Sequence, residues 1–486
     1  MRRFFNNIEK VKSAVLALLV ASSLVLSCQI WFNEKLWPDG YNFLDTIKKT
    51  SFGGFIESLG KKDKKEESVQ EDVLIPYNFF VYMVKESDHA GYMLSPNDES
   101  FSYAKNFLHE LMGKILSGAD GQNVSAVTEK EWQSALCENG MYVDYGAAYQ
   151  TKTFLQLVGV ETKNDILESE IGKMGRFAIT YDEGKIRLYA SDLSDNEFYR
   201  IDYKEKAEEV YDIIKMCTDK ASVDNRFSFF IGADKDSPIA GAAVFDSYIV
   251  LSESTVETKT AFALERKKIG GNMLALSDGI LQSFSVNPKT ARRYTDADEN
   301  VAFVQNQSSV KLAKNGYVEF HASESDRGLS MVDDAGEDTP LALDLYPLVF
   351  MAERLNLLVS GKADISLYVS SVKEENGKYF VTLDYTFNGE NLIIKDNGEP
   401  VSAVTAEFEG GFLKNYKQYM TDLELTENKI VLPSSYGGID KIFENMTMEQ
   451  KREKIKDMFI GYIDENGGEI YPGWIIRSGE NYSINY

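Results

Sequence analysis

The stretch from Ser13 to Phe32, SAVLALLVASSLVLSCQIWF, constrains what this chain can fold into more than any other, because it carries no charged residue. As a helix, the nineteen residues 14–32 would be about 28 Å long, which matches the hydrocarbon core of a bilayer. The segment before it is basic, with the cations Arg2, Arg3, Lys10 and Lys12. Since basic flanks of a membrane helix remain on the cytoplasmic side, the sequence predicts a cytoplasmic N-terminus and an extracytoplasmic remainder.

The same pattern also describes an exported protein whose leader is processed. A basic flank followed by an apolar stretch is typical of a signal peptide, and LVLSC, which ends at Cys28, approximates a bacterial lipobox. The bulky Leu26 and the aromatic sequence QIWFNEKLWP after the cysteine argue against lipid attachment. We favour an uncleaved anchor in which Trp31 and Phe32 lie at the outer membrane interface. An exported lipoprotein acylated at Cys28, or a secreted form, is the alternative.

One face of the predicted anchor helix is lined by small side chains. Ser13, Ala17 and Ala21 recur at every fourth position, and Ser22 lies beside them. Small residues at this spacing let a second helix approach closely within lipid, although alanine and serine are also common in single spans. The pattern indicates a partner-helix contact at these four residues.

The rest of the chain has the composition of a folded, acidic protein. The chain has 486 residues and a net charge of −24, and 12% of its residues are aromatic. Aromatic content of this kind is typical of packed hydrophobic cores and not of a disordered tail. A body this acidic repels nucleic acid and anionic lipid headgroups, so we expect neither as a ligand.

Cysteine usage excludes a disulfide-stabilised scaffold, because only Cys28, Cys137 and Cys217 occur. The apolar spacing that ends at Cys217 predicts a buried helical face. We expect two buried thiols, with a Cys137–Cys217 bridge as the less favoured alternative.

Sequence patterns of known catalytic and metal sites are missing. The histidines are His89, His109 and His321, and no HExxH, CxxC, GxSxG or Walker pattern is present. His109 falls among apolar residues of a predicted helix, where a core or boundary position is expected. The loop Asp296–Asn300 begins like a calcium loop, but Val301 and Gln307 replace the glycine and glutamate that an EF-hand needs. We predict no catalytic, cofactor or metal site, with a looser surface calcium site at this loop as an alternative.

The order of apolar patterns predicts an α+β class, with helices packed on antiparallel meanders. Helices are expected at 99–116, 128–137, 203–217, 343–358 and 448–459, with a short one ending near Phe284. Strands are expected at 153–160, 175–182, 184–191, 301–306, 308–313, 316–322, 364–372, 378–387, 391–395, 401–411 and 471–476. The glycine pairs at 410–411 and 437–438 are expected to be turns.

Changes in composition along the chain predict domain boundaries. We expect a cytoplasmic tail at 1–12, an anchor at 13–32, a juxtamembrane linker at 33–72, an N-terminal α+β domain at 73–265, a central α+β domain at 266–330, a linker at 331–342 and a C-terminal domain at 343–486.

Three segments resemble one protein family. The start of the chain, NNIEKVKSAVLALLVASSLVLSCQIWFNEKLWPDGYNF, resembles the N-terminus of the YycH family of Gram-positive bacteria. The segments NPKTARRYTDADENVAFVQNQSSVKLAKNGYVEFHA and GKYFVTLDYTFNGENLI resemble meanders of its central and C-terminal domains.

The resemblance implies a role in signal transduction. YycH-like proteins are membrane-anchored regulators that act with a sister protein, YycI, on the sensor histidine kinase WalK (YycG), whose two-component system controls cell-wall metabolism. They are not enzymes, and their C-terminal unit is PepSY-like. Family precedent places the kinase contact on the anchor helix, which here would involve Ser13, Ala17, Ala21 and Ser22. An exported lipoprotein that captures a peptide or a cell-wall fragment is the alternative function.

Overall fold

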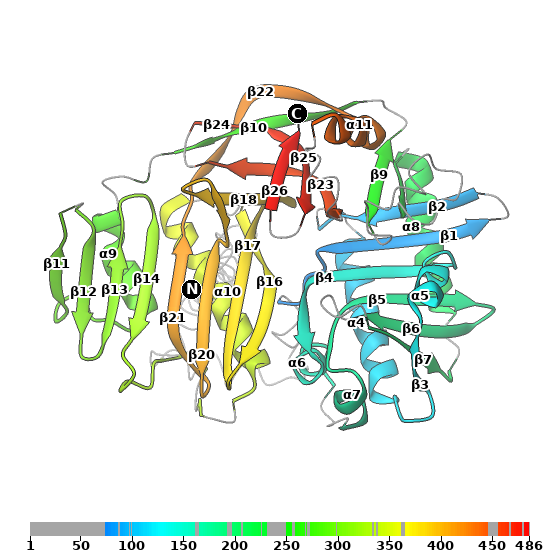
Figure 1. Ribbon diagram of the computed structural model, residues 1–486, viewed down its shortest axis with the longest axis horizontal. Coiled ribbons are helices and arrows are strands. Elements are labelled where there is room, and N and C mark those ends of the chain that lie inside the picture. The colour runs from blue at the N-terminus through cyan, green and yellow to red at the C-terminus, as the bar shows by residue number, and fades with distance from the viewer. Residues whose placement is uncertain are drawn as a thin grey trace, which may run out of the picture. The chain divides into compact units, whose positions relative to one another are not determined.

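The computed structural model describes residues 73–85, 88–96, 98, 100–160, 165–191, 197–205, 208–224, 226–230, 249–254, 258–267, 269, 273–297, 299–332, 335–336, 339–360, 365–445, 455–465, 468–478 and 481–485. Within these ranges the chain is a mixed α+β protein, mostly strands, with eight helices (Figure 1). The described residues belong to one compact unit, 66–486. The predicted α+β class is therefore confirmed for this part of the chain.

The first sheet is formed by residues 78–203. Its strands are β1 (Asn78–Lys85), β2 (Asp88–Leu94), β3 (Val124–Val127), β4 (Gly140–Gln150), β5 (Lys173–Asp182), β6 (Lys185–Ser191) and β7 (Phe198–Tyr203). They are antiparallel and run in the order β2-β1-β4-β5-β6-β7-β3. The helices of this region are α4 (Phe101–Ser117), α5 (Glu129–Ala135), α6 (Thr151–Leu157), α7 (Asp165–Glu170) and α8 (Glu209–Asp224).

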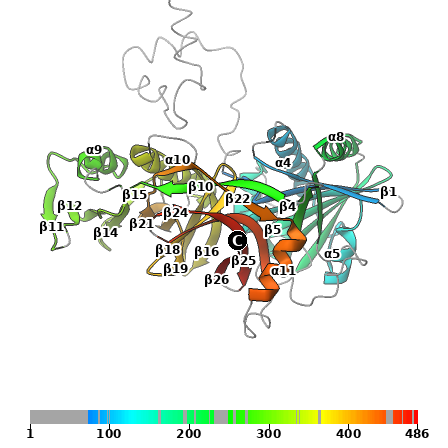
Figure 2. The same ribbon diagram turned by 90° about the horizontal axis from the view of Figure 1, so that it is seen from above.

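Helices cover both faces of this sheet, because its strands carry apolar residues at successive positions. Phe79 belongs to the same core as Leu108 of α4, whereas its neighbour Phe80 packs in a second core with Trp132 of α5. Side chains of adjacent strand residues point to opposite faces, so a sheet that is apolar on both faces needs cover on both. Figure 2 shows α4 and α8 on one side of the strands and α5 on the other.

The second sheet is formed by residues 292–485 and has fourteen strands. They are β11 (Arg292–Thr295), β12 (Val301–Gln305), β13 (Ser308–Leu312), β14 (Tyr317–Ala322), β15 (Leu329–Ser330), β16 (Ile365–Glu375), β17 (Lys378–Phe387), β18 (Glu390–Asp396), β19 (Glu399–Val401), β20 (Val404–Glu409), β21 (Phe412–Tyr419), β23 (Ile455–Asp464), β25 (Pro472–Ser478) and β26 (Asn481–Asn485). Its main path is β11-β12-β13-β14-β21-β20-β17-β18-β23-β25-β26, in which the pair β18–β23 is parallel. Helices α9 (Met273–Ser283) and α10 (Leu341–Ser360) lie together on one face of this sheet (Figure 2).

Two smaller sheets and one helix complete the described chain. Strands β8 (Arg226–Phe230) and β9 (Val250–Ser254) form a pair, and β22 (Leu423–Pro433), β10 (Thr258–Arg266) and β24 (Glu469–Ile470) form a ribbon in that order. The helix α11 (Ser435–Asn445) follows β22 directly.

Several sequence predictions need correction. Residues 153–160 were predicted to be a strand, but α6 occupies most of them. The predicted helix 203–217 begins only at Glu209, because Tyr203 still belongs to β7. The predicted helix 448–459 is wrong at its C-terminal end, because β23 begins at Ile455. The helix α11 was not predicted. The glycines at 437–438 lie inside α11 and not in a turn.

The predicted helices 99–116 and 343–358, the short helix ending near Phe284, and most of the predicted meander strands are confirmed. The capping box of Thr128 and Glu131 at the start of α5 is present as expected. Strands from both sides of the expected linker 331–342 share one sheet, since β14 pairs with β21. The proposed domain boundaries themselves stay predictions.

Candidate functional site

The residues predicted for partner and membrane contact lie outside the described part of the chain. This holds for Ser13, Ala17, Ala21 and Ser22 and for Trp31 and Phe32. Among the described residues, no helix is long and apolar enough to cross a membrane. The anchor and its contact face therefore stay predictions.

The histidines and cysteines in the described residues have structural environments. His109 is buried in α4, and its Nε2 lies 2.9 Å from the hydroxyl of Tyr145, as expected for a core position. Burial lowers the pKa of His109 to about 3, so the ring is neutral at physiological pH. No disulfide joins Cys137 to Cys217. Cys217 is buried as predicted, but Cys137 is exposed, because it follows the short helix α5 at the surface.

The calcium-loop candidate is closed by its own hydrogen bonds. The two carboxylate oxygens of Asp296 accept from the main-chain and side-chain nitrogens of Asn300, at 2.8 and 2.9 Å. Glu299 pairs with Lys314 on the neighbouring turn. Within the described residues no group of three or more histidine, cysteine or acidic side chains is arranged to hold a metal ion.

The most elaborate polar site lies where the start of the body meets the second sheet. We name it the junction cluster and define it as Tyr77, Tyr368, Asn391, Asp457 and Arg477. Its members come from the residue before β1 and from the strands β16, β18, β23 and β25. The cluster thus joins residues that lie up to 400 positions apart in the sequence.

Tyr77 is the centre of the junction cluster. Its hydroxyl donates to Oδ2 of Asp457 at 2.7 Å and accepts from Nδ2 of Asn391 at 3.1 Å. Its ring packs on Tyr368, with centroids 5.4 Å apart, and meets Phe459 edge-on at 6.3 Å. Burial, together with the negative charge of Asp457, raises the pKa of Tyr77 well above its ordinary value, so the phenol stays protonated and acts as a donor.

Gly146 of the first sheet lies beside this tyrosine. Gly146 of β4 has a φ of +74°, and a Cβ there would lie 3.4 Å from Cβ of Tyr77 and 3.6 Å from Cε2 of Tyr368. Pairing between β4 and β5 is irregular between Asp144 and Tyr149, so the strand bends at this place. The positive φ favours glycine here, and the bend brings the strand beside the cluster.

Asp457, Arg477 and Tyr482 lie in a row across three neighbouring strands beside Tyr77. Asp457 is opposite Arg477 in the β23–β25 register, and Arg477 is opposite Tyr482 in the β25–β26 register. Burial raises the pKa of Asp457, and the Arg477 cation opposes that rise. Burial alone would lower the pKa of Arg477, but Asp457 and Tyr482 raise it overall. The row therefore places a partly buried guanidinium next to the carboxyl group of Asp457.

A buried ion pair supports the first-sheet side of the junction. Nε of Arg176 lies 2.8 Å from Oδ2 of Asp144, and both side chains are 9% exposed. The other carboxylate oxygen, Oδ1, accepts from the main-chain nitrogen of Gly146 at 2.7 Å. The pair therefore fixes the bend of β4 that faces Tyr77.

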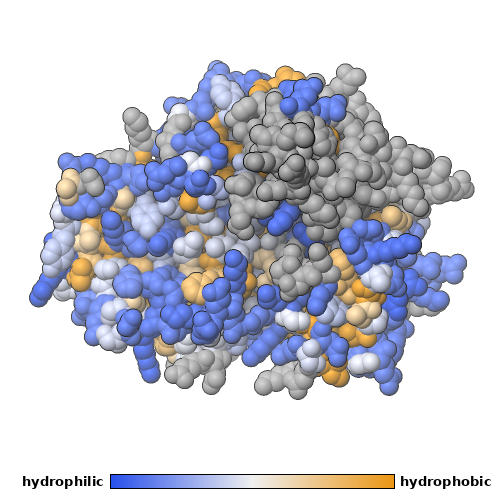
Figure 3. Space-filling view, viewed as in Figure 1, coloured by the Kyte–Doolittle hydropathy of each residue, from blue (hydrophilic) through white to orange (hydrophobic). Residues whose placement is uncertain are grey.

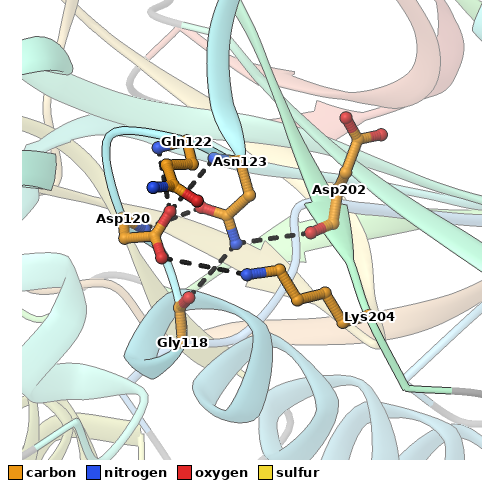
Figure 4. A network of polar contacts seen from close by, with 6 residues as sticks. All are labelled: Gly118, Asp120, Gln122, Asn123, Asp202 and Lys204. Carbon is orange, nitrogen blue, oxygen red and sulfur yellow. Dashed lines mark hydrogen bonds and ion pairs between the residues drawn. The ribbon is translucent and has the colours of Figure 1, made fainter.

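A second polar network, shown in Figure 4, lies at the surface and closes a turn. Asp120 accepts from the main-chain nitrogens of Gln122 and Asn123, and these bonds lower its pKa. The Asn123 side chain donates to the carbonyls of Gly118 and Asp202, at 3.1 and 3.3 Å. The network attaches the end of α4 to β7, which is a structural role.

The junction cluster holds the start of the body against the second sheet. Its tyrosine is a donor with a raised pKa, its aspartate is held by hydrogen bonds, and its arginine balances the charge. Figure 3 shows a face covered largely by hydrophilic residues, with smaller hydrophobic areas between them. Sequence reasoning missed this cluster, since nothing in the local pattern around Tyr77 points to Asp457.

No protein-family model matches this chain, and no curated protein matches it.

Proposed function

We propose that this protein is a membrane-anchored, extracytoplasmic regulator of a two-component sensor histidine kinase that controls cell-wall metabolism. It has no catalytic activity of its own and acts by protein–protein contact through its transmembrane helix and outer domains. The resemblance of three segments to YycH proteins supports this proposal. It implies a WalK-like kinase and a YycI-like sister protein as partners, and a PepSY-like C-terminal unit.

The observation that carries the proposal is the position of Tyr77. This residue follows the 33–72 linker closely, and its hydroxyl is held by Asp457 and Asn391 of the second sheet. A displacement of the linker would therefore act on both sheets at once and not on a loose N-terminal strand. Such an attachment suits a protein whose anchor and body must move together.

The mechanism is a difference in affinity for two states of the kinase. A partner can shift a two-state equilibrium only by binding one state more tightly than the other. The predicted small-residue face of the anchor supplies the contact within the membrane. The body, attached at Tyr77, couples that contact to events outside the membrane.

A crosslinking scan of the anchor tests the proposal. Single cysteines at Ser13, Ala17 and Ala21 in a Cys28→Ser background should trap the kinase in membranes of the native host. A cysteine at Leu19, which lies on the side of an ideal helix opposite to Ser13, Ala17 and Ala21, is the matched control and should trap little. If none of the three small-residue positions traps a kinase while the body alone regulates fully, the anchor-contact mechanism is wrong.

The lipobox-like sequence at Cys28 favours one competing function, an exported binding lipoprotein. That function requires acylation of Cys28, so Cys28→Ser would release the protein from membranes. Under the regulator proposal the same variant stays in the membrane fraction, because the helix itself holds it there. Metabolic labelling with a fatty acid reports acylation directly.

A further inference from the structure

The strand β11 (Arg292–Thr295) ends the second sheet and has unusual chemistry for this protein. It pairs only with β12 in the sheet order, and all four of its residues are exposed. Figure 1 shows it as the outermost strand at one end of the sheet. Its sequence is Arg-Arg-Tyr-Thr, in a chain whose net charge is −24.

The hydrogen-bond pattern of the β11 hairpin identifies the main-chain groups that face away from β12. The main-chain nitrogen of Asp296 donates to the carbonyl of Asn300 at 3.0 Å, so Asp296 faces its partner strand. Main-chain direction alternates along a strand, so Tyr294 and Arg292 also face β12, and Thr295 and Arg293 face outward. Each of these two outward residues offers one N–H and one C=O, and the described part of the chain holds no strand beyond them.

The side chains of this edge add positive charge and an aromatic surface. Arg292 and Arg293 form no ion pair with any described residue, and Tyr294 is 55% exposed. Arg293 is opposite the buried Phe303 in the β11–β12 register, which places it on the core face of the sheet. Arg292 and Tyr294 lie on the other face, so the two cations flank both sides of the edge.

Charged residues on an edge strand often serve only to prevent pairing with other strands. Arginine differs from that role here in two respects. Two consecutive arginines attract carboxylates on both faces of an added strand. The acidic surface of the rest of the chain repels acidic segments, so such segments bind at this edge and not elsewhere on the surface. The edge thus attracts acidic segments, whereas a second β11 edge, which carries the same two cations, is repelled.

We propose that β11 is a docking edge for an extended acidic segment of a partner protein, which adds to the second sheet as a further strand. Main-chain hydrogen bonds to Arg293 and Thr295 hold the segment, and two adjacent acidic side chains pair with Arg292 and Arg293. This inference does not rest on the proposed function, because such an edge would bind whatever protein carries the segment.

The test uses the full-length protein in a neutral detergent and a fluorescent peptide, acetyl-Thr-Val-Glu-Glu-Val-Thr-amide. Fluorescence anisotropy at low salt should report saturable binding, and the matched Lys-Lys peptide should not bind. The double variant Arg292→Glu/Arg293→Glu should weaken binding by about tenfold or more. The control Lys311→Glu changes an exposed cation of the same sheet, on a strand paired on both sides, and should leave binding unchanged.

A second pair of variants separates strand addition from plain charge attraction. Thr295→Pro removes an outward N–H that β12 does not use, whereas Thr295→Val keeps it in an equally strand-compatible residue. Binding should fall about fivefold or more in the proline variant only, which corresponds to the loss of a main-chain hydrogen bond. Hydrogen exchange should show new protection of the Arg293 and Thr295 amides when the peptide binds.

Several results would overturn the inference. They are equal binding of the acidic and basic peptides, no binding of either, an equal effect of Lys311→Glu, or unchanged exchange at Arg293 and Thr295. Because the assay contains no kinase, its failure would leave the regulator proposal to be decided by the crosslinking scan alone.

Discussion

At the scale of single residues, Asp344 is the clearest case of an ionisable side chain that is buried without full hydrogen bonding. It lies in the first turn of α10, is 1% exposed, and its Oδ1 has no hydrogen-bond partner among the described residues. A carboxylate at a helix N-terminus gains about 0.3–1 kcal/mol from the helix dipole. Loss of solvation is larger, and burial raises the pKa of Asp344 from 3.8 to about 7.

The raised pKa predicts that protein stability falls with rising pH. Well below pH 4 the carboxyl is protonated in both the folded and the unfolded chain, so it adds no pH dependence to the free energy of unfolding. Between pH 4 and pH 7 only the folded chain keeps the proton, and the free energy of unfolding should decrease by an amount on the order of 2–4 kcal/mol. Asp344→Asn should flatten this slope in urea denaturation measured from pH 4 to pH 8.

The exposed residue Asp278 of α9 supplies the control. Asp278→Asn should leave the slope as it is in the unmodified protein. A slope that persists in Asp344→Asn would mean that another group releases the proton.

At the scale of elements, α11 depends on a glycine that packs against an aromatic ring. A Cβ at Gly438 would lie 2.6 Å from Cδ1 and Nε1 of Trp474, and the indole nitrogen donates to the carbonyl of Pro433 at 3.1 Å. The ring is 4% exposed and is held by this hydrogen bond, so it cannot move away freely. The close approach of α11 to β25 requires glycine at this position.

Substitution by alanine should have opposite effects at two helical glycines. Alanine improves helix propensity by about 1 kcal/mol, but in Gly438→Ala the clash with a fixed ring should outweigh it and lower stability by about 1–2 kcal/mol. In Gly279→Ala of α9 the nearest atom is a Leu358 methyl at 3.3 Å, which can shift, so stability should be unchanged or slightly higher. Urea denaturation of both variants checks the signs, and equal effects would contradict the packing explanation.

The elements that could be predicted from the sequence are those with regular local patterns. Helices with regular apolar spacing, such as α4 and α10, and hairpin strands with clear alternation, such as β12 and β13, follow from local patterns. Consecutive glycines normally indicate a turn, so α11 was missed. In the structure one of its two glycines, Gly438, packs against the distant Trp474. The apolar alternation in residues 153–160 is compatible with a strand as well as with a helix. In the structure these residues form α6, whose Phe154 stacks on Phe177.

At the scale of the whole molecule, the junction cluster could not be predicted from the sequence. Tyr77 and Asp457 are 380 positions apart, and their bond arises because the β4 bend and the β23 register bring them together. Local patterns give the faces of strands but not which sheets meet. The anchor was predicted from local hydropathy, and its contact face from small-residue spacing and the family resemblance. Both lie outside the described residues.

The last prediction concerns the attachment itself. Tyr77→Phe keeps the ring contacts but leaves Asp457 and Asn391 without their shared partner, so the free energy of unfolding should fall by about 1–3 kcal/mol. Tyr103→Phe, at a tyrosine that is 62% exposed, is the matched control and should change little. If the cluster joins the two sheets, amide hydrogen exchange in Tyr77→Phe should rise in β1 and in β23 together. A rise confined to β1 would mean that Tyr77 stabilises only its own strand, and the coupling of anchor to body would need another route.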